Sequence, residues 1–145
     1  MAVDERDDWT DRRSRAINVH AEALDQQRRV EASRASELLV TFVEQARARG
    51  LPSTALHVRS YQGRGRCRTR LTGWYLKPDQ TIAVALDGRF YLMTAQLSTW
   101  QWLTGWLLPV TLEPAEPGMR VGVGGRDGES WSLPELLAHR LDADW

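Results

Sequence analysis

The spacing of apolar residues changes once along this chain, close to Pro52. Before that point apolar side chains recur every three or four residues, which is the period of an amphipathic helix. Thr10 is a suitable N-cap, and Gly50 is a suitable residue to end such a helix. The pattern predicts a long helix over residues 13–50, preceded by a disordered tail over residues 1–12. The face expected to dock carries Ala35, Leu38, Leu39, Phe42, Val43 and Ala46.

The first half of this helix has a weaker apolar pattern than the second half. Ile17 and Leu24 lie seven residues apart, on a heptad line that continues through Glu31 to Leu38. A glutamate at the centre of a helix–helix seam leaves that seam incomplete. This half is therefore expected to be either a projecting arm or one half of a dimer contact, and Ile17 and Leu24 are interface candidates.

Beyond Pro52 apolar and polar residues alternate, which is the period of a half-buried strand. The alternating segments are residues 55–61, 66–76, 81–86 and 89–94. Asp87-Gly88 is typical of a two-residue hairpin, and Ser132 and Glu135 have the spacing of a capping box before a short helix. These elements predict an α+β fold with a long N-terminal helix, an antiparallel β-meander of about four to six strands and a short C-terminal helix.

Composition supports a folded domain, because 42% of the 145 residues are hydrophobic. We expect residues 51–145 to form one sheet domain that carries a Trp-rich cap and the C-terminal helix. The single cysteine, Cys67, excludes an intrachain disulfide framework and a Cys-based zinc site. The N-terminus lacks the basic and apolar regions of a secretory signal, so a cytoplasmic location is expected.

The charges balance overall, with 19 Lys and Arg against 19 Asp and Glu, but they are unevenly placed. Residues 45–78 hold 8 basic and no acidic side chains. Alternate strand residues share a face, so we expect a row of Arg64, Arg66, Arg68 and Arg70, with Arg59 and Tyr61 across the hairpin. Such a row matches the spacing of nucleic-acid phosphates, and Tyr61 offers a stacking surface. The alternative is a solvated row, or one paired with acidic residues elsewhere in the chain.

Residues 90–112 form a stretch of 23 residues without any charge. It contains too many polar residues to cross a bilayer, so no membrane insertion is expected. As a helix over residues 95–108, it would cap the sheet with Leu97, Trp100, Leu103 and Leu107. Trp102 and Trp106 would lie on another side, and a short helix in a small domain rarely buries both sides. Trp100, Trp102 and Trp106 are therefore interface candidates.

No catalytic group stands out in the sequence. Cys67 lies in a basic setting and His57 on the neighbouring strand, so a Cys/His pair is conceivable, although a structural strand cysteine is the simpler interpretation. The three histidines lack metal-ligand spacing. Residues 122–128 resemble a phosphate loop but have Asp127 at the third glycine position. We expect no enzymatic activity, no metal and no cofactor.

Two hypotheses about function remain. The first is a non-enzymatic cytosolic protein–protein interaction or adaptor module, a homodimer or other homo-oligomer that buries the exposed half of its long helix and its Trp-rich segment. The second is a protein that binds nucleic acid or another polyanion with the Arg-rich strands over residues 59–70.

Overall fold

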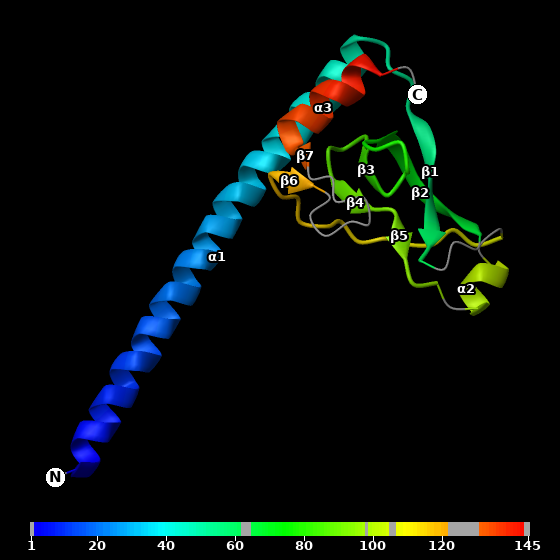
Figure 1. Cartoon of the computed structure of the whole chain (residues 1–145). Coiled ribbons are helices and arrows are strands. Elements are labelled where there is room, and N and C mark those ends of the chain that lie inside the picture. Colours follow the sequence, from blue (N-terminus) through cyan, green and yellow to red (C-terminus); the bar gives the residue numbers. More distant parts are fainter. Residues whose placement is uncertain (1, 62–64, 98, 105–106, 122–130, 144–145) are drawn as a thin grey trace.

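The computed structural model describes residues 2–61, 65–97, 99–104, 107–121 and 131–143. A single long helix, α1 (Ala2–Ala48), projects from a small domain (Figure 1). The domain contains strands β1 (Thr54–Ser60), β2 (Arg66–Tyr75), β3 (Ile82–Ala85), β4 (Phe90–Leu92), β5 (Thr94–Ala95), β6 (Arg120–Val121) and β7 (Trp131–Ser132), and helices α2 (Thr99–Thr104) and α3 (Leu133–Asp142). The structure confirms the predicted α+β class, with its long N-terminal and short C-terminal helices.

Helix α1 starts earlier than the apolar pattern predicts. The helical backbone begins at Ala2, whereas the sequence placed the start at residue 13 with Thr10 as the cap. The cap prediction is wrong, because Thr10 lies inside the helix and its hydroxyl donates to the carbonyl of Arg6 at 2.8 Å. Acidic residues are concentrated before Thr10. Negative charge near the first turn of a helix stabilises it through the helix dipole, which favours the earlier start.

The end of α1 lies where the sequence predicts it. Gly50 adopts a φ of +71°, a conformation that favours glycine and reverses the chain after a helix. The N–H of Leu51 then donates to the carbonyl of Ala46 at 2.9 Å, which satisfies one of the free carbonyls of the last turn. The chain leaves the helix directly into β1.

The main sheet closes on itself. Its strand order is β4-β3-β2-β1-β5, and only Met93 separates β4 from β5 along the chain. The Met93 N–H donates to the carbonyl of Thr81 beside β3, and the Met93 carbonyl accepts from the Arg59 N–H in β1, both at 2.8 Å. The two edges of the sheet are therefore halves of one extended segment, and the strands form a small barrel.

The strand pairing agrees with the predicted meander except at this closure. The pairs β1–β2, β2–β3 and β3–β4 are antiparallel. Strand β5 instead runs parallel to β1, which makes the sheet mixed. Strands β6 and β7 form a separate two-stranded sheet beside α3.

Two hydrophobic cores lie on the two sides of the barrel wall. The inner core consists of Leu56, Val58, Cys67, Tyr75, Ala83, Ala85, Tyr91 and Met93. The outer core joins the barrel to α1 and α3, and the predicted docking face of α1 is buried in it. Trp74 is central to it, because its ring meets Phe42 edge-on at 6.2 Å between ring centroids and its Nε1 donates to the Leu51 carbonyl at 3.1 Å.

Helix α3 is held at both ends. The hydroxyl of Ser132 accepts from the Glu135 N–H at 3.4 Å, which confirms the predicted N-cap. Near the other end Arg140 is buried, and its Nε donates to the carbonyl of Tyr75 at 2.7 Å. This bond fixes α3 against the last residue of β2.

Candidate functional site

The N-terminal part of α1 is an uncovered arm. Side chains from residue 5 to residue 31 are all exposed, over a helical length of about 40 Å, and Figure 1 shows this segment, here named the arm, pointing away from the domain. Glu31 ends it, because its Oε1 accepts from the N–H of Met119 at 3.1 Å. The predicted interface residues Ile17 and Leu24 lie on the arm, 59% and 49% exposed.

One side of the arm carries its large apolar side chains, with Arg12, Arg13, His20 and Gln27 among them. Successive residues of a helix are rotated by about 100° around its axis, and a group of apolar residues lies within about 80° of one line along the arm. These residues are Trp9, Ala16, Ile17, Val19, Ala23, Leu24 and Val30. We name them the arm stripe. Trp9, Val19 and Val30 are at least half exposed, and the sequence analysis missed them. Trp9 fell in the predicted tail, although its spacing of seven from Ala16 was a readable signal.

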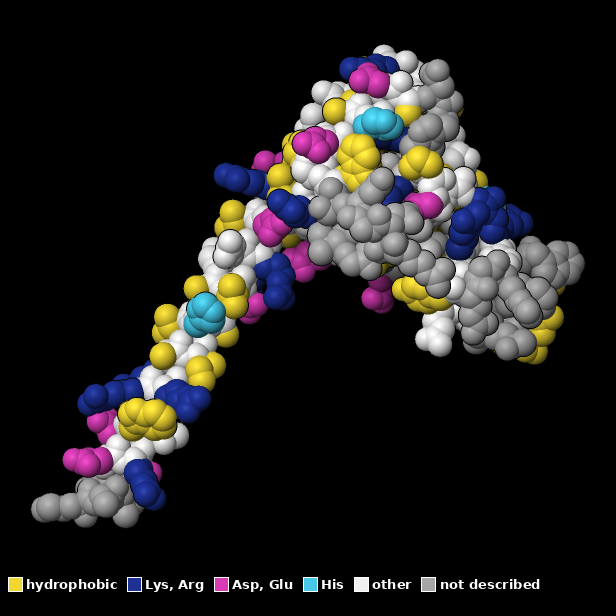
Figure 2. Space-filling view, viewed as in Figure 1, with side chains coloured by type: hydrophobic (Ala, Val, Ile, Leu, Met, Phe, Trp, Pro, Cys, Tyr) yellow, Lys and Arg dark blue, Asp and Glu magenta, His cyan; other side chains and the backbone are white. Residues whose placement is uncertain are grey.

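The opposite side of the arm is polar, and it carries charges with heptad spacing, each one residue before Trp9, Ala16, Ala23 or Val30. These charges are Asp8, Arg15, Glu22 and Arg29, in which acid and base alternate. Within the arm Arg12 pairs with Asp8 at 2.7 Å, and the guanidinium of Arg13 lies 5.5 Å from the centroid of the Trp9 ring. Exposed pairs of this kind contribute little to stability, so a partner can replace them at low cost. Figure 2 shows apolar and charged side chains intermixed along the arm.

The uncharged segment forms only part of the predicted cap, because Leu97, Val110 and Leu112 pack against the inner core while the described side chains of α2 do not. Helix α2 spans Thr99–Thr104 rather than residues 95–108, because Thr94–Ala95 is taken by β5. Trp100 is 73% exposed, and Leu103 and Leu107 are also exposed, so three of the four residues expected to cover the sheet face solvent and only Leu97 packs on it. Trp102 belongs to α2, but its side chain lies outside the description, and Trp106 lies outside the described residues. We name Trp100, Leu103, Leu107 and Leu108 the apolar tip.

The arginine row has the predicted alternation. Arg66, Arg68 and Arg70 are exposed, whereas Cys67 between them is buried. Arg59 lies directly opposite Arg66 on β1. We name Arg59, Arg66, Arg68 and Arg70 the arginine face, and Figure 2 shows basic side chains gathered on the barrel. Tyr61 is 70% exposed beyond the end of β1, and Arg64 lies outside the described residues.

The partners of this face are neutral oxygens. Arg59 donates to the carbonyl of Asp79 at 3.5 Å, and Arg66 donates to the side-chain oxygen of Gln80. In the part of the chain that the structure describes, none of the four arginines forms an ion pair. Like charges facing each other across strands repel, so the face retains its attraction for an anion.

The Cys/His pair considered from sequence does not form. Cys67 lies opposite Val58, while His57 lies opposite Arg68, so the two side chains project from opposite sides of the barrel wall. Burial raises the pKa of the Cys67 thiol, which disfavours the thiolate that a nucleophile requires.

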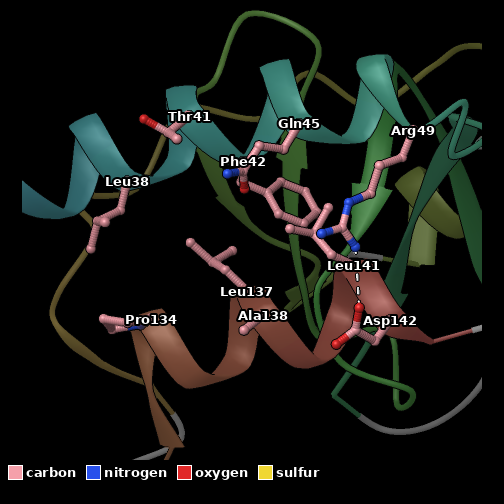
Figure 3. Close-up of a pocket in the computed structure, with 10 residues that line it drawn as sticks. All are labelled: Leu38, Thr41, Phe42, Gln45, Arg49, Pro134, Leu137, Ala138, Leu141 and Asp142. Atoms are coloured by element: carbon pink, nitrogen blue, oxygen red, sulfur yellow. Dashed lines mark hydrogen bonds and ion pairs between the residues drawn. The ribbon is translucent and has the colours of Figure 1, made fainter.

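A shallow groove of about 360 Å³ runs between α1 and α3. Its walls are mainly apolar, and Leu38 and Phe42 face Leu137 and Leu141 across it (Figure 3). The ion pair of Arg49 with Asp142, at 3.1 Å, lies at one end. The groove holds no set of groups suited to acid–base or nucleophilic chemistry.

Neither a cluster of metal-ligating side chains nor a helix suited to crossing a bilayer occurs among the residues that the structure describes. Comparison of the chain with protein-family models, curated proteins and solved structures finds no match. The arm, the arginine face and the apolar tip are therefore the features from which a function is inferred.

Proposed function

We propose that this protein is a non-enzymatic interaction module that forms a homodimer through the arm of α1. The exposed stripe on the arm is the observation that supports this proposal most strongly. Most helical stability in proteins comes from packing an apolar face. Among the described residues the arm meets the rest of the chain at its C-terminal end, where Arg28 and Glu31 lie beside residues 116–118, and its large apolar side chains stay exposed. Pairing two arms buries both stripes and supplies that packing.

The charges with heptad spacing favour an antiparallel pair with a two-fold axis near Val19. About this axis Asp8 lies level with Arg29 of the second copy, and Arg15 lies level with Glu22. Each charged residue then faces a residue of opposite charge, and the two-fold symmetry forms each of these ion pairs twice. A parallel pair in register would place identical residues at the same level.

The position of the domain on α1 also favours an antiparallel pair of arms. The buried face of α1 begins at Ala35, a few residues beyond the end of the arm. In the antiparallel pair the N-terminus of each arm ends near the point where the other copy's domain begins. The domains then lie at opposite ends of the helix pair, whereas a parallel pair would bring both to one end.

The stripe is also suited to close packing about this axis. Ala16 and Ala23 lie on the two sides of the axis, within one and a half turns of it, where small side chains allow the two backbones to approach. Trp9 and Val30 lie at the two ends, so the large ring of one copy meets the smaller side chain of the other. Ile17 and Leu24 border the alanines and add apolar area.

Sedimentation equilibrium of the full chain tests the proposal. We expect a mass of twice 16.5 kDa, and the chain mass alone for Ile17→Glu/Leu24→Glu, because charges in the stripe remain unpaired. Ser14→Glu/Asn18→Glu, on the polar side, is the matched control and should remain dimeric. A monomeric wild-type chain at about 100 μM would refute self-association. A dimeric Ile17→Glu/Leu24→Glu would show that the arm is not the contact.

A further inference from the structure

We propose that the apolar tip and the arginine face together bind the surface of a bilayer that contains anionic lipids. This site is separate from the arm and does not depend on the proposed dimer. Its occupant is a lipid surface carrying net negative charge, which the tip contacts at headgroup depth without crossing the bilayer and the arginines contact through headgroup anions.

The tip has the composition that an interfacial lipid contact requires. Leu107 and Leu108 are 65% and 66% exposed, and Leu103 and Trp100 project from α2 just before them. Large exposed apolar side chains grouped in this way mark a contact with another molecule or with lipid. The whole surrounding segment, residues 90–112, contains no charge that this contact would have to desolvate.

The tip and the arginine face are joined through the backbone. The N–H of Val110 donates to the carbonyl of Arg68 at 2.7 Å, and Val110 forms a parallel bridge with Thr69. The chain therefore passes from Leu107 and Leu108 directly onto the edge of β2. Helix α2 also contacts β2. Aliphatic, aromatic and cationic side chains are thus presented by neighbouring segments of the barrel.

The charge of the face selects an anionic surface. Residues 45–78 contain no acidic side chain, and the four arginines form no ion pair in the described chain. Basic residues beside an apolar contact segment are attracted by the negative potential of anionic leaflets. Guanidinium groups donate in a fork that matches phosphate and carboxylate oxygens, which are the groups such headgroups present.

Two other occupants fit these observations less well. A second copy placed tip to tip would oppose one arginine face with another, and like charges repel. The arm lies away from α2, so pairing of the arms leaves the tip uncovered (Figure 1). Nucleic acid would use the arginines and Trp100, but Leu103, Leu107 and Leu108 have no flat ring for a base to stack on.

Co-sedimentation of the full chain with vesicles tests the site. The probes are phosphatidylcholine vesicles with and without about 30% phosphatidylserine. We expect binding to the mixed vesicles that weakens with salt, and little binding to phosphatidylcholine alone. Leu107→Ser/Leu108→Ser should reduce the affinity at least about tenfold, because the apolar contact is lost. Arg68→Gln/Arg70→Gln should reduce it roughly tenfold or more, because two attractive charges are lost.

Leu86→Ser/Arg89→Gln is the matched control, since it makes the same types of change at the β3–β4 turn beside α1 and should leave binding unaltered. All these positions are exposed, so folding should be retained. Absence of binding to the mixed vesicles, or equal binding to both vesicle types, would overturn the proposal. Salt-sensitive binding to an oligonucleotide without vesicle binding, unaffected by Leu107→Ser/Leu108→Ser, would assign the arginine face to nucleic acid instead.

Discussion

Arg15→Glu is expected to weaken the dimer about tenfold or more, and the double change Arg15→Glu/Glu22→Arg is expected to restore it. In the antiparallel pair Arg15 of one copy faces Glu22 of the other, and the two-fold axis places this pair in the interface twice. In Arg15→Glu a glutamate at position 15 therefore faces Glu22 of the other copy at two symmetry-related points. The double change exchanges the signs and recreates both attractions. The dissociation constant, measured by sedimentation at low salt, is the readout.

The matched control is Asn18→Glu, which adds an acidic residue to the polar side of the arm and should leave the dissociation constant nearly unchanged. Glu22→Arg alone should weaken the dimer as Arg15→Glu does. If the double variant were as weak as either single variant, the two residues would not face each other and the antiparallel register would be wrong.

Gly73→Ala is expected to lower the free energy of unfolding by about 3 kcal/mol or to prevent folding. A Cβ at this position would overlap the carbonyl oxygen of Val84 and lie 2.8 Å from the Cα of Ala85, both in the backbone of β3. Gly73 pairs with Ala85 in the sheet, so the two strands would have to separate to make room. Urea unfolding at fixed protein concentration measures the loss.

Thr72→Ala is the control for this change. Thr72 neighbours Gly73 on β2, but its side chain is exposed, so its replacement should alter the free energy of unfolding by less than about 0.5 kcal/mol. Wild-type stability of Gly73→Ala would contradict the close approach of β2 and β3.

The elements of the fold were predictable from sequence wherever a local signal fixes them. The docking face of α1 and the Ser132 cap each depend on residues close together in the chain. Asp87-Gly88 marks the β3–β4 turn as predicted, although the loop between Ala85 and Arg89 has three residues rather than two. Closure of the barrel was not predictable in this way. It depends on Met93 bonding from one position to Arg59 of β1 and to Thr81 beside β3, and no periodicity reports a contact between distant segments.

The arginine face and the apolar tip show the same limit, because a local pattern does not report contacts between distant segments. Alternation correctly separated the exposed arginines of β2 from buried Cys67. Periodicity also grouped Trp100, Leu103 and Leu107 on one side of a helix, but it cannot say which side packs, and these residues proved exposed. The closure that places Thr94–Ala95 in β5 shortens α2 and changes what the segment can cover.

The most direct test of the arm pairing is the distance between spin labels placed at Asp7 of the two copies. Asp7→Cys lies on the exposed polar side of α1, and Cys67 is buried, so the label should attach at Asp7 without disturbing the stripe. An antiparallel pair about Val19 separates the two labels by about 35 Å or more at 1.5 Å per residue. A single distance below about 25 Å would mean parallel arms, and no defined distance would mean that the arms do not pair.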